Sequence, residues 1–406
     1  MVQDEPRTTD LSSPLILLTA VLMAVGLVMV TSSTAPVDRS MLDGPWWRSP
    51  VGRQGMFVLA GLAIMAITAR LGCAALSWAS FRRVVPPAVF VILAVLLAAT
   101  LIPGIGDERR GSHRWLVLAP AWTGLSFQPS ELAKLTLVML LAWLLGERGT
   151  DPRSFRSAFL PASAAIGGYV LLVGTANFGT AALLAGVGGM MLLVAGCCWR
   201  HLFLLGSLGG CGMAGLLYAA PYRLARLAAY RDIWAEPRGA GYQPLQSLAT
   251  IASGGWLGKG LGAGVQKYGY LPDSHSDFIF SVLCEEAGFL GGVVVIAMFC
   301  GLTWLGMRVM AQARSPLERL LAFGLTATIG LQAVMNIAVV TVMAPTTGIS
   351  LPLVSAGGSG LMAFSFSVGL LGAIAHRNAG GEVVEHRSDL PARGRSLLRI
   401  GERFAW

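Results

Sequence analysis

Residues 271–307 read LPDSHSDFIFSVLCEEAGFLGGVVVIAMFCGLTWLGM, a short polar segment that runs directly into a long apolar stretch. An apolar stretch of about 20 residues is long enough to cross a bilayer as a helix. Asp277 stands where this stretch begins, and a carboxylate at bilayer depth costs roughly 2.5 to 3.5 kcal/mol, so such residues usually face a cavity or a substrate path. The segment therefore predicts a membrane helix with a functional carboxylate, Asp277, at one end.

The rest of the chain has the composition of an integral membrane protein. Of the 406 residues, 54% are hydrophobic and 13% are charged, whereas soluble domains carry about 25% charged residues. We predict an all-α polytopic membrane fold with about ten transmembrane helices. The predicted spans are residues 14–33, 55–72, 84–103, 131–146, 159–174, 180–199, 201–220, 278–307, 319–343 and 352–376.

The distribution of basic residues predicts how these spans are oriented. We expect a cytoplasmic N-terminal segment (1–13), a transmembrane domain (14–376) and a basic cytoplasmic tail (377–406). The segment 221–277, between the seventh and eighth predicted helices, is then a large extracytoplasmic loop, although it carries six basic residues. Either the helix count is wrong by one, or these charges serve an anionic ligand. The net charge of +9 favours membrane lipids with anionic headgroups as partners, and nothing indicates nucleic acid.

Four groups of motifs then carry a resemblance to a known family. They are Gly111-Ser-His-Arg114-Trp115 with Gln128-Pro-Ser-Glu131-Leu-Ala-Lys134; Gly239-Ala-Gly-Tyr242-Gln243 with Val265-Gln266-Lys267; the Asp277 segment with Glu285-Glu286-Ala-Gly288; and Gln332 and Asn336 with Pro345-Thr-Thr-Gly348 and Leu351-Pro-Leu-Val-Ser355-Ala-Gly-Gly-Ser359. In this order and spacing they resemble the SEDS family (shape, elongation, division and sporulation), whose members polymerise peptidoglycan. The run at 265–272 is more similar to the division and sporulation branches than to the elongation branch.

The resemblance implies an activity, partners and a location. It implies a ten-helix membrane fold that transfers glycosyl groups on lipid II, where a sugar hydroxyl attacks the undecaprenyl-linked glycan and undecaprenyl pyrophosphate leaves. It also implies a class B penicillin-binding transpeptidase and divisome proteins as partners. The expected location is the bacterial cytoplasmic (inner) membrane, as a multi-pass protein at the division septum.

Asp277 matches the essential Asp of the family's motif, with Ser276 where the family has Thr. Desolvation raises and nearby cations lower the pKa of such a carboxyl, which suits a general base. Alternatively, Asp277 ligates a divalent cation, Mg²⁺ or Mn²⁺, that bridges pyrophosphate oxygens. A purely structural interpretation is that Asp277 caps the helix that follows it. His275 either relays a proton to Asp277 or simply faces solvent.

Basic residues in the loops are candidates for binding the pyrophosphate. We expect Arg223, Lys259 and Lys267 to do so, with Arg226 and Arg114 behind them, because Arg and Lys clamps are the usual partners of phosphoryl oxygens. The alternative for each is a surface charge that contacts lipid headgroups.

Two further motifs are candidates for substrate contact. Lys134 lies one turn inside an apolar span, where it either forms a structural ion pair with Glu131 or lines a substrate path. Ser355 and Ser359 belong to a segment rich in Gly, Ser and Pro, 345–359, which has the composition of a re-entrant element. The alternative is a compact loop.

Departures from the family pattern keep other functions open. Asn177 stands where the family usually has an acidic residue, Thr347 where it has Lys and Ala356 where it has Tyr. A non-catalytic scaffold that activates a transpeptidase is one alternative to the enzyme. A lipid II flippase is the other, with Lys134 and the adjacent Glu285 and Glu286 as its polar track.

Overall fold

The structure is a computed structural model of the chain. It describes residues 10–34, 47, 49–77, 79–100, 102, 106–109, 112–117, 126–147, 150–218 and 221–379. Most of the predicted N-terminal segment and cytoplasmic tail lie outside these residues.

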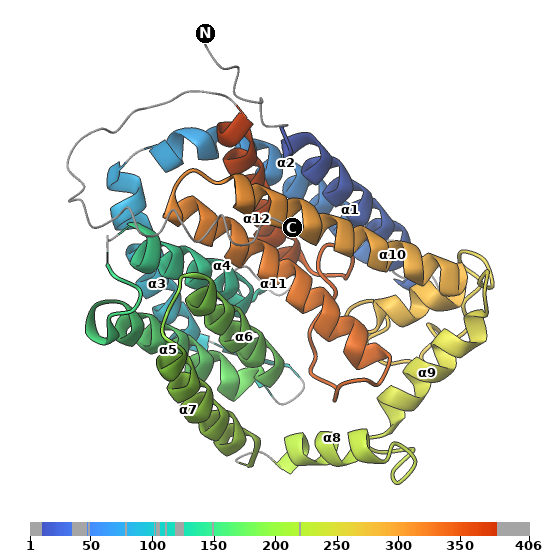
Figure 1. Cartoon of the computed structure of the whole chain (residues 1–406). Helices are drawn as coiled ribbons and strands as arrows, with labels where there is room; N and C mark the ends of the chain where they lie inside the picture. Colours follow the sequence, from blue (N-terminus) through green and yellow to red (C-terminus); the bar gives the residue numbers. More distant parts are fainter. Residues whose placement is uncertain are drawn as a thin grey trace.

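Within the described residues, ten apolar helices form the body of the molecule, and Figure 1 shows how they are arranged. Nine of them, within the described residues, are long and apolar enough to cross a membrane, and the tenth, α6, is apolar and has 17 residues. They correspond one to one to the ten predicted spans, so the predicted fold class is confirmed. The helices are α1 (Ser12–Thr34), α2 (Pro50–Ser77), α3 (Ala79–Thr100), α4 (Pro129–Ala142), α5 (Leu160–Ala176), α6 (Phe178–Val194), α7 (Trp199–Tyr218), α10 (Ile279–Gln312), α11 (Pro316–Val340) and α12 (Gly358–Ala379).

Small residues allow these helices to approach closely, as in other membrane bundles. A Cβ added at Gly369 of α12 would lie 2.6 Å from the carbonyl oxygen of Met65 in α2. One added at Gly26 of α1 would lie 2.6 Å from the carbonyl oxygen of Val354. The glycines therefore fix α12 and the segment before it against the N-terminal helices.

The structure differs from the predicted spans in two places. A small antiparallel sheet, β1 (Gly106–Arg109), β2 (Ser112–Val117) and β3 (Ser126–Phe127), lies between α3 and α4. It was not predicted, because its strands are short and partly charged. The last helix begins at Gly358 and not at residue 352, since residues 341–357 form turns and extended backbone, with Leu353 at a φ of 64°.

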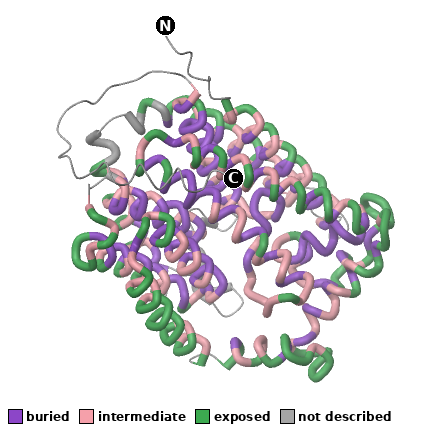
Figure 2. The backbone as a smooth tube through the Cα atoms, viewed as in Figure 1, coloured by how far each residue is buried: buried purple, intermediate pink, exposed green. Residues whose placement is uncertain are grey.

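The large loop predicted at 221–277 contains two helices, α8 (Pro221–Arg231) and α9 (Tyr242–Gly254). The chain from α7 through α8 to α9 follows the edge of the molecule (Figure 1). No described residue of α7 is buried within the chain, which Figure 2 shows as an exposed helix. The end of the loop, where Asp277 lies, precedes the start of α10 and contacts the segment before α12 through Ser355.

Candidate functional site

A cavity of about 1060 Å³ lies where the loop meets the helix ends. Its walls come from α1, α2, α4, α6, α8, α9, α11, α12 and the segments before α10 and α12. Five of the predicted site residues line it: Arg226, His275, Asp277, Ser355 and Ser359. The structure thus brings together the segment around Asp277 and the Gly-rich segment 345–359, which are distant in sequence.

Side chains of α11 and of the Gly-rich segment hold the chain on either side of Asp277. The amide nitrogen of Asn336 donates to the carbonyl oxygens of Asp277, at 2.8 Å, and Ile349, at 2.7 Å. The hydroxyl of Ser355 donates to the carbonyl oxygen of Ser276 at 2.7 Å. The backbone at Asp277 is therefore fixed from two sides, while its carboxylate lies among the residues that line the cavity.

His275 and Ser355 occupy different places in this arrangement. The carbonyl oxygen of His275 accepts a hydrogen bond from the N–H of Ala356 at 3.0 Å, and its side chain is exposed at the cavity. Ser355 is buried and also accepts from the N–H of Leu351 at 2.8 Å. Ser355 thus positions the backbone of the acidic segment, whereas the ring of His275 stays accessible.

Asp277 lies just outside the capping position of α10. The helix begins at Ile279 and its N-cap residue is Phe278, whose side chain makes no capping hydrogen bond. This arrangement gives no support to the interpretation of Asp277 as the N-cap residue.

Asp277 does not belong to a ready-made cluster of metal-binding side chains in the described part of the chain. No group of three His, Cys, Asp or Glu side chains within the described residues is arranged to hold a metal ion. Mg²⁺ is commonly held by one or two carboxylates together with substrate phosphates and water. The residues therefore fit a divalent cation that Asp277 shares with a phosphorylated substrate, and a divalent cation stays a prediction.

Lys134 lies behind the cavity wall in a polar cluster. Its ammonium donates to Glu131 Oε2 at 2.7 Å and to Gln332 Oε1 at 2.7 Å, and lies 4.8 Å from the centre of the Phe364 ring. Only 4% of Lys134 is exposed, whereas Glu131 lines the cavity. The ion pair between Lys134 and Glu131, one of the two alternatives from the sequence, is thus present in the structure. Of the two residues, Glu131 is the one that lines the cavity.

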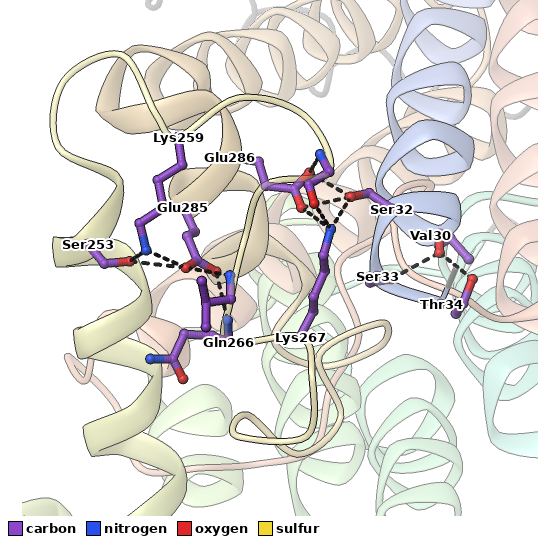
Figure 3. A network of polar contacts seen from close by, with 12 residues as sticks. Val30, Ser32, Ser33, Thr34, Ser253, Lys259, Gln266, Lys267, Glu285 and Glu286 are labelled. Atoms are coloured by element: carbon purple, nitrogen blue, oxygen red, sulfur yellow. Dashed lines mark hydrogen bonds and ion pairs between the residues drawn. The ribbon is translucent and has the colours of Figure 1, made fainter. Parts of the chain in front are cut away.

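Two lysines of the segment between α9 and α10, Lys259 and Lys267, bind the adjacent glutamates of α10 (Figure 3). Lys259 contacts Glu285 at 2.7 Å and Lys267 contacts Glu286 at 2.7 Å. Lys267 also donates to the hydroxyl of Ser32 in α1, at 2.9 Å, and that hydroxyl donates to Glu286 at 2.7 Å. Neither lysine lines the cavity, and each has a carboxylate partner in this structure. Binding of pyrophosphate by these lysines stays a prediction.

Backbone hydrogen bonds close the chain around these ion pairs. The N–H groups of Lys259 and Gly260 donate to the carbonyl oxygens of Glu285 and Glu286, each at 3.0 Å. These carbonyls are free because α10 is broken at Gly288, where φ is 74°. The chain from Lys259 to Glu286 therefore forms a closed loop, which we call the 259–286 loop. Hydrogen bonds and ion pairs join the two ends of this loop, and Asp277 lies between them in the sequence.

Arg223 does not line the cavity in this structure. Its guanidinium donates to the carbonyl oxygens of Gly174, Thr175 and Leu216, at 2.9, 2.8 and 2.6 Å. Its donors therefore hold together the ends of α5 and α7. Arg114 lies in β2, and its side chain is outside the described part of the structure.

Some residues of the site were missed as candidates in the sequence. Asn336 was quoted only as part of a motif, yet it fixes the backbone of Asp277. Asn177 and Thr180 at the start of α6 also line the cavity. The sequence signal for Asn336 is an amide within an apolar span, where an unpaired polar group is costly.

Comparisons with known proteins find similarity along most of the chain. Residues 13–380 match the family of FtsW, RodA and SpoVE, described as cell cycle protein. The chain belongs to this family. It is 35% identical to stage V sporulation protein E of Bacillus subtilis, over 90% of this chain and 97% of that protein. It is 39% identical to a probable peptidoglycan glycosyltransferase FtsW of Halomonas elongata, over 88% of each chain.

Solved structures of this family share the fold. A chain from a study of the structural coordination of polymerization and crosslinking by a peptidoglycan synthase complex matches with a TM-score of 0.72 and 26% identity, over 90% of this chain and 98% of that chain. The rod shape determining protein RodA of Thermus thermophilus matches with a TM-score of 0.61 and 26% identity, over 90% of this chain and 97% of that chain. The family resemblance read from the motifs is therefore confirmed along nearly the whole chain.

Proposed function

We propose that this protein is a peptidoglycan glycosyltransferase that polymerises lipid II into glycan strands during cell division. The observation that carries the proposal is Asp277, a carboxylate on a fixed backbone at a cavity of about 1060 Å³ between membrane helices. Relatives named peptidoglycan glycosyltransferase cover almost the same length of chain. The apolar helix faces suit a lipid-linked substrate whose sugars occupy the cavity.

Asp277 acts as the general base in this proposal. Its carboxylate accepts the proton of the attacking sugar hydroxyl, which then forms the new glycosidic bond as the bond to undecaprenyl pyrophosphate breaks. The clamp by Asn336 and Ser355 restricts where the carboxylate can point, so the base is positioned before the substrate arrives. If a divalent cation takes part, Asp277 holds it, and it supplies charge stabilisation to the leaving pyrophosphate.

The structure favours the enzyme over a flippase. A polar track through the membrane would need accessible polar groups, yet Lys134 is paired with Glu131, and Glu285 and Glu286 are each paired with a lysine. These are the residues that the flippase alternative requires. Their mutual pairing leaves the cavity at Asp277 as the better supported place for chemistry.

The proposed partner is a class B penicillin-binding transpeptidase within the divisome, at the septum of the bacterial cytoplasmic membrane. A similar chain belongs to a peptidoglycan synthase complex, and the ten apolar helices place this protein in a membrane. The scaffold alternative predicts that the protein stimulates such a partner without making glycan strands itself.

The test is polymerisation of labelled lipid II by purified protein, with and without a cognate transpeptidase. Asp277→Asn keeps the size of the side chain but removes the base and a strong metal ligand, so glycan strands should disappear from the gel. Asp232→Asn, at an exposed position directly after α8, is the matched control and should polymerise normally. Glycan synthesis by Asp277→Asn at the normal rate would contradict the catalytic assignment, and stimulation of a partner without synthesis would favour the scaffold.

A further inference from the structure

The wall of the cavity formed by α2 carries two polar side chains that have no role in the proposed chemistry at Asp277. Arg53 and Gln54, which we call the α2 pair, both line the cavity. Gln54 is only 3% exposed, and its side-chain nitrogen is buried without a hydrogen-bond partner. The guanidinium of Arg53 has no hydrogen-bond or ion-pair partner among the described residues. The α2 pair therefore brings an unpaired cation and an unsatisfied donor to the cavity.

The chemistry of the α2 pair favours an anionic ligand. A buried donor without a partner destabilises the folded protein, because its lost hydration is not compensated. A ligand oxygen that accepts from Gln54 would remove this cost. The guanidinium of Arg53 adds a positive charge, and charge-assisted hydrogen bonds from Arg are typical of phosphate recognition. Phosphate oxygens fit both groups, since they are acceptors and carry negative charge.

Contacts along the Gly-rich segment show where Arg226, the other arginine of the cavity, lies relative to Asp277. Near the start of this segment, the carbonyl oxygen of Thr346 accepts from Nη1 of Arg226 at 3.4 Å. Three residues further on, the carbonyl oxygen of Ile349 shares the amide nitrogen of Asn336 with that of Asp277. Arg226 thus contacts the Gly-rich segment before the place where this segment meets the backbone around Asp277.

The α2 pair lies toward the other end of the Gly-rich segment. The hydroxyl of Ser355 donates to the carbonyl oxygen of Ser276, so the segment is still beside the backbone around Asp277 at this point. Three residues later, a Cβ added at Gly358 would lie 2.5 Å from the ring of Phe57, which follows the α2 pair by one helical turn. The backbone around Asp277 therefore contacts the Gly-rich segment between the places where α8 and α2 contact it.

Polymerisation of lipid II requires room for two pyrophosphates. The attacking lipid II keeps its own undecaprenyl pyrophosphate, while the glycan that it attacks loses one. Arg53 and Arg226 are the only Arg or Lys residues that line the cavity among the described residues. The volume of about 1060 Å³ is slightly above the usual range for one drug-sized ligand, about 300–1,000 Å³.

We propose that the α2 pair forms a second anion-binding subsite, which holds the pyrophosphate of one lipid-linked substrate while Arg226 holds that of the other. The inference rests on the proposed function, because it assigns both subsites to substrates of polymerisation. With one pyrophosphate on each side of Asp277, the hydroxyl of one substrate and the reacting sugar carbon of the other meet at the base.

Binding of inorganic pyrophosphate to the full-length protein in detergent, followed by titration calorimetry, tests the two subsites without turnover. The wild type should bind two pyrophosphates, and Arg53→Gln and Arg226→Gln should each bind one. Arg53→Lys keeps the charge and should retain both sites, as should Arg238→Gln, in an exposed turn. The proposal would be overturned by fewer than two sites in the wild type, by two unchanged sites in Arg53→Gln, or by loss of both sites in that variant.

Gln54→Leu separates a role in binding from a role in folding. Leucine leaves no unsatisfied donor in the buried position, so the temperature of thermal unfolding should not fall. Pyrophosphate should nevertheless bind the α2 subsite roughly tenfold more weakly, since one hydrogen bond to a charged group is lost. A lower unfolding temperature together with unchanged binding would show that Gln54 is structural and would remove it from the subsite.

A further arm distinguishes substrate phosphate from the phosphate of lipid headgroups. The titrations are repeated in nanodiscs with and without phosphatidylglycerol. Two sites in both nanodiscs support the assignment to substrate, whereas loss of the α2 subsite only with phosphatidylglycerol would assign it to lipid and overturn the proposal. Asp277→Asn should still bind two pyrophosphates. Failure of this inference, seen in binding, is therefore distinct from failure of the proposed function, seen as polymerisation by Asp277→Asn.

Discussion

The ion pair between Lys267 and Glu286 should be a main source of stability for the 259–286 loop. Its side chains are 1% and 0% exposed, and the ammonium donates to Glu286, to Ser32 and to the carbonyl oxygen of Gly262, at 2.7, 2.9 and 2.8 Å. Removing one partner of a buried pair costs about 3–5 kcal/mol, because the other charge stays buried without compensation. We therefore expect Lys267→Met to lower the free energy of unfolding by about that amount.

The neighbouring pair provides a matched comparison within the same loop. The side chain of Lys259 is 33% exposed, whereas that of Glu285 is 0% exposed. Glu285 also accepts from the N–H groups of Val265 and Gln266, at 3.0 and 3.3 Å, and water can reach the position of the exposed ammonium. Lys259→Met should therefore be less destabilising than Lys267→Met. The double variant Lys267→Met with Glu286→Gln should be more stable than Lys267→Met alone, because no uncompensated charge remains.

The measurement is unfolding of the purified variants in detergent micelles, followed by tryptophan fluorescence under denaturant. The reasoning would be refuted if Lys267→Met and Lys259→Met were equally stable. It would also be refuted if the loss in free energy of unfolding of the double variant equalled the sum of the losses of Lys267→Met and Glu286→Gln, since the two side chains would then act independently. Ser32→Ala tests the link to α1, and it should cost about 1 kcal/mol, the usual contribution of one hydrogen bond.

Three further outcomes follow from the structure. Lys134→Met leaves Glu131 without its partner, so we expect loss of stability, measured by thermal unfolding, together with loss of polymerisation. Gly258→Ala should destabilise the loop by roughly 1–3 kcal/mol, because its φ is +80° and a Cβ would strike the carbonyl oxygen of Glu286; limited proteolysis should then cut the loop faster. Burial raises the pKa of the Cys197 thiol to about 11, helped by the nearby Cys198. An alkylating reagent at pH 8 should therefore modify Cys197 only in the denatured protein. In the native protein, the rate of alkylation of Cys197 should rise as the pH approaches 11.

Much of this molecule could be predicted from local sequence patterns. The ten apolar spans follow from run length, and Asp277 follows from a carboxylate at the start of a span. The partners of the charged residues could not be predicted in the same way, because they depend on how distant segments meet. Lys259 and Lys267 bind glutamates 26 and 19 residues further along the chain. The sequence therefore suggested that these lysines bind an anionic ligand, because it does not show that the two glutamates lie next to them.

The same limit explains why the residues around Asp277 were missed. Asn336 contacts the carbonyl oxygen of Asp277 across 59 residues. An isolated amide in a predicted membrane helix indicates that the side chain needs a hydrogen-bond partner, but the sequence does not show which residue that partner is. Arg226 and Arg223 lie one turn apart on α8, so their spacing alone could not decide which of them reaches the cavity. Only the packing of α8 against the ends of α5 and α7 separates them.

Arg223 has an electrostatic consequence that extends beyond the carbonyls it binds. Helices α5 and α7 end at this residue, and each helix C-terminus carries the equivalent of about half a negative charge from its macrodipole. The guanidinium, 5.7 Å from the ring of Phe178 in α6, compensates both ends through hydrogen bonds that its planar fork allows and an ammonium would not reproduce. The positive end of the α6 macrodipole, at the cavity, therefore meets less opposition from the C-terminal ends of α5 and α7, through a residue that does not itself line the cavity.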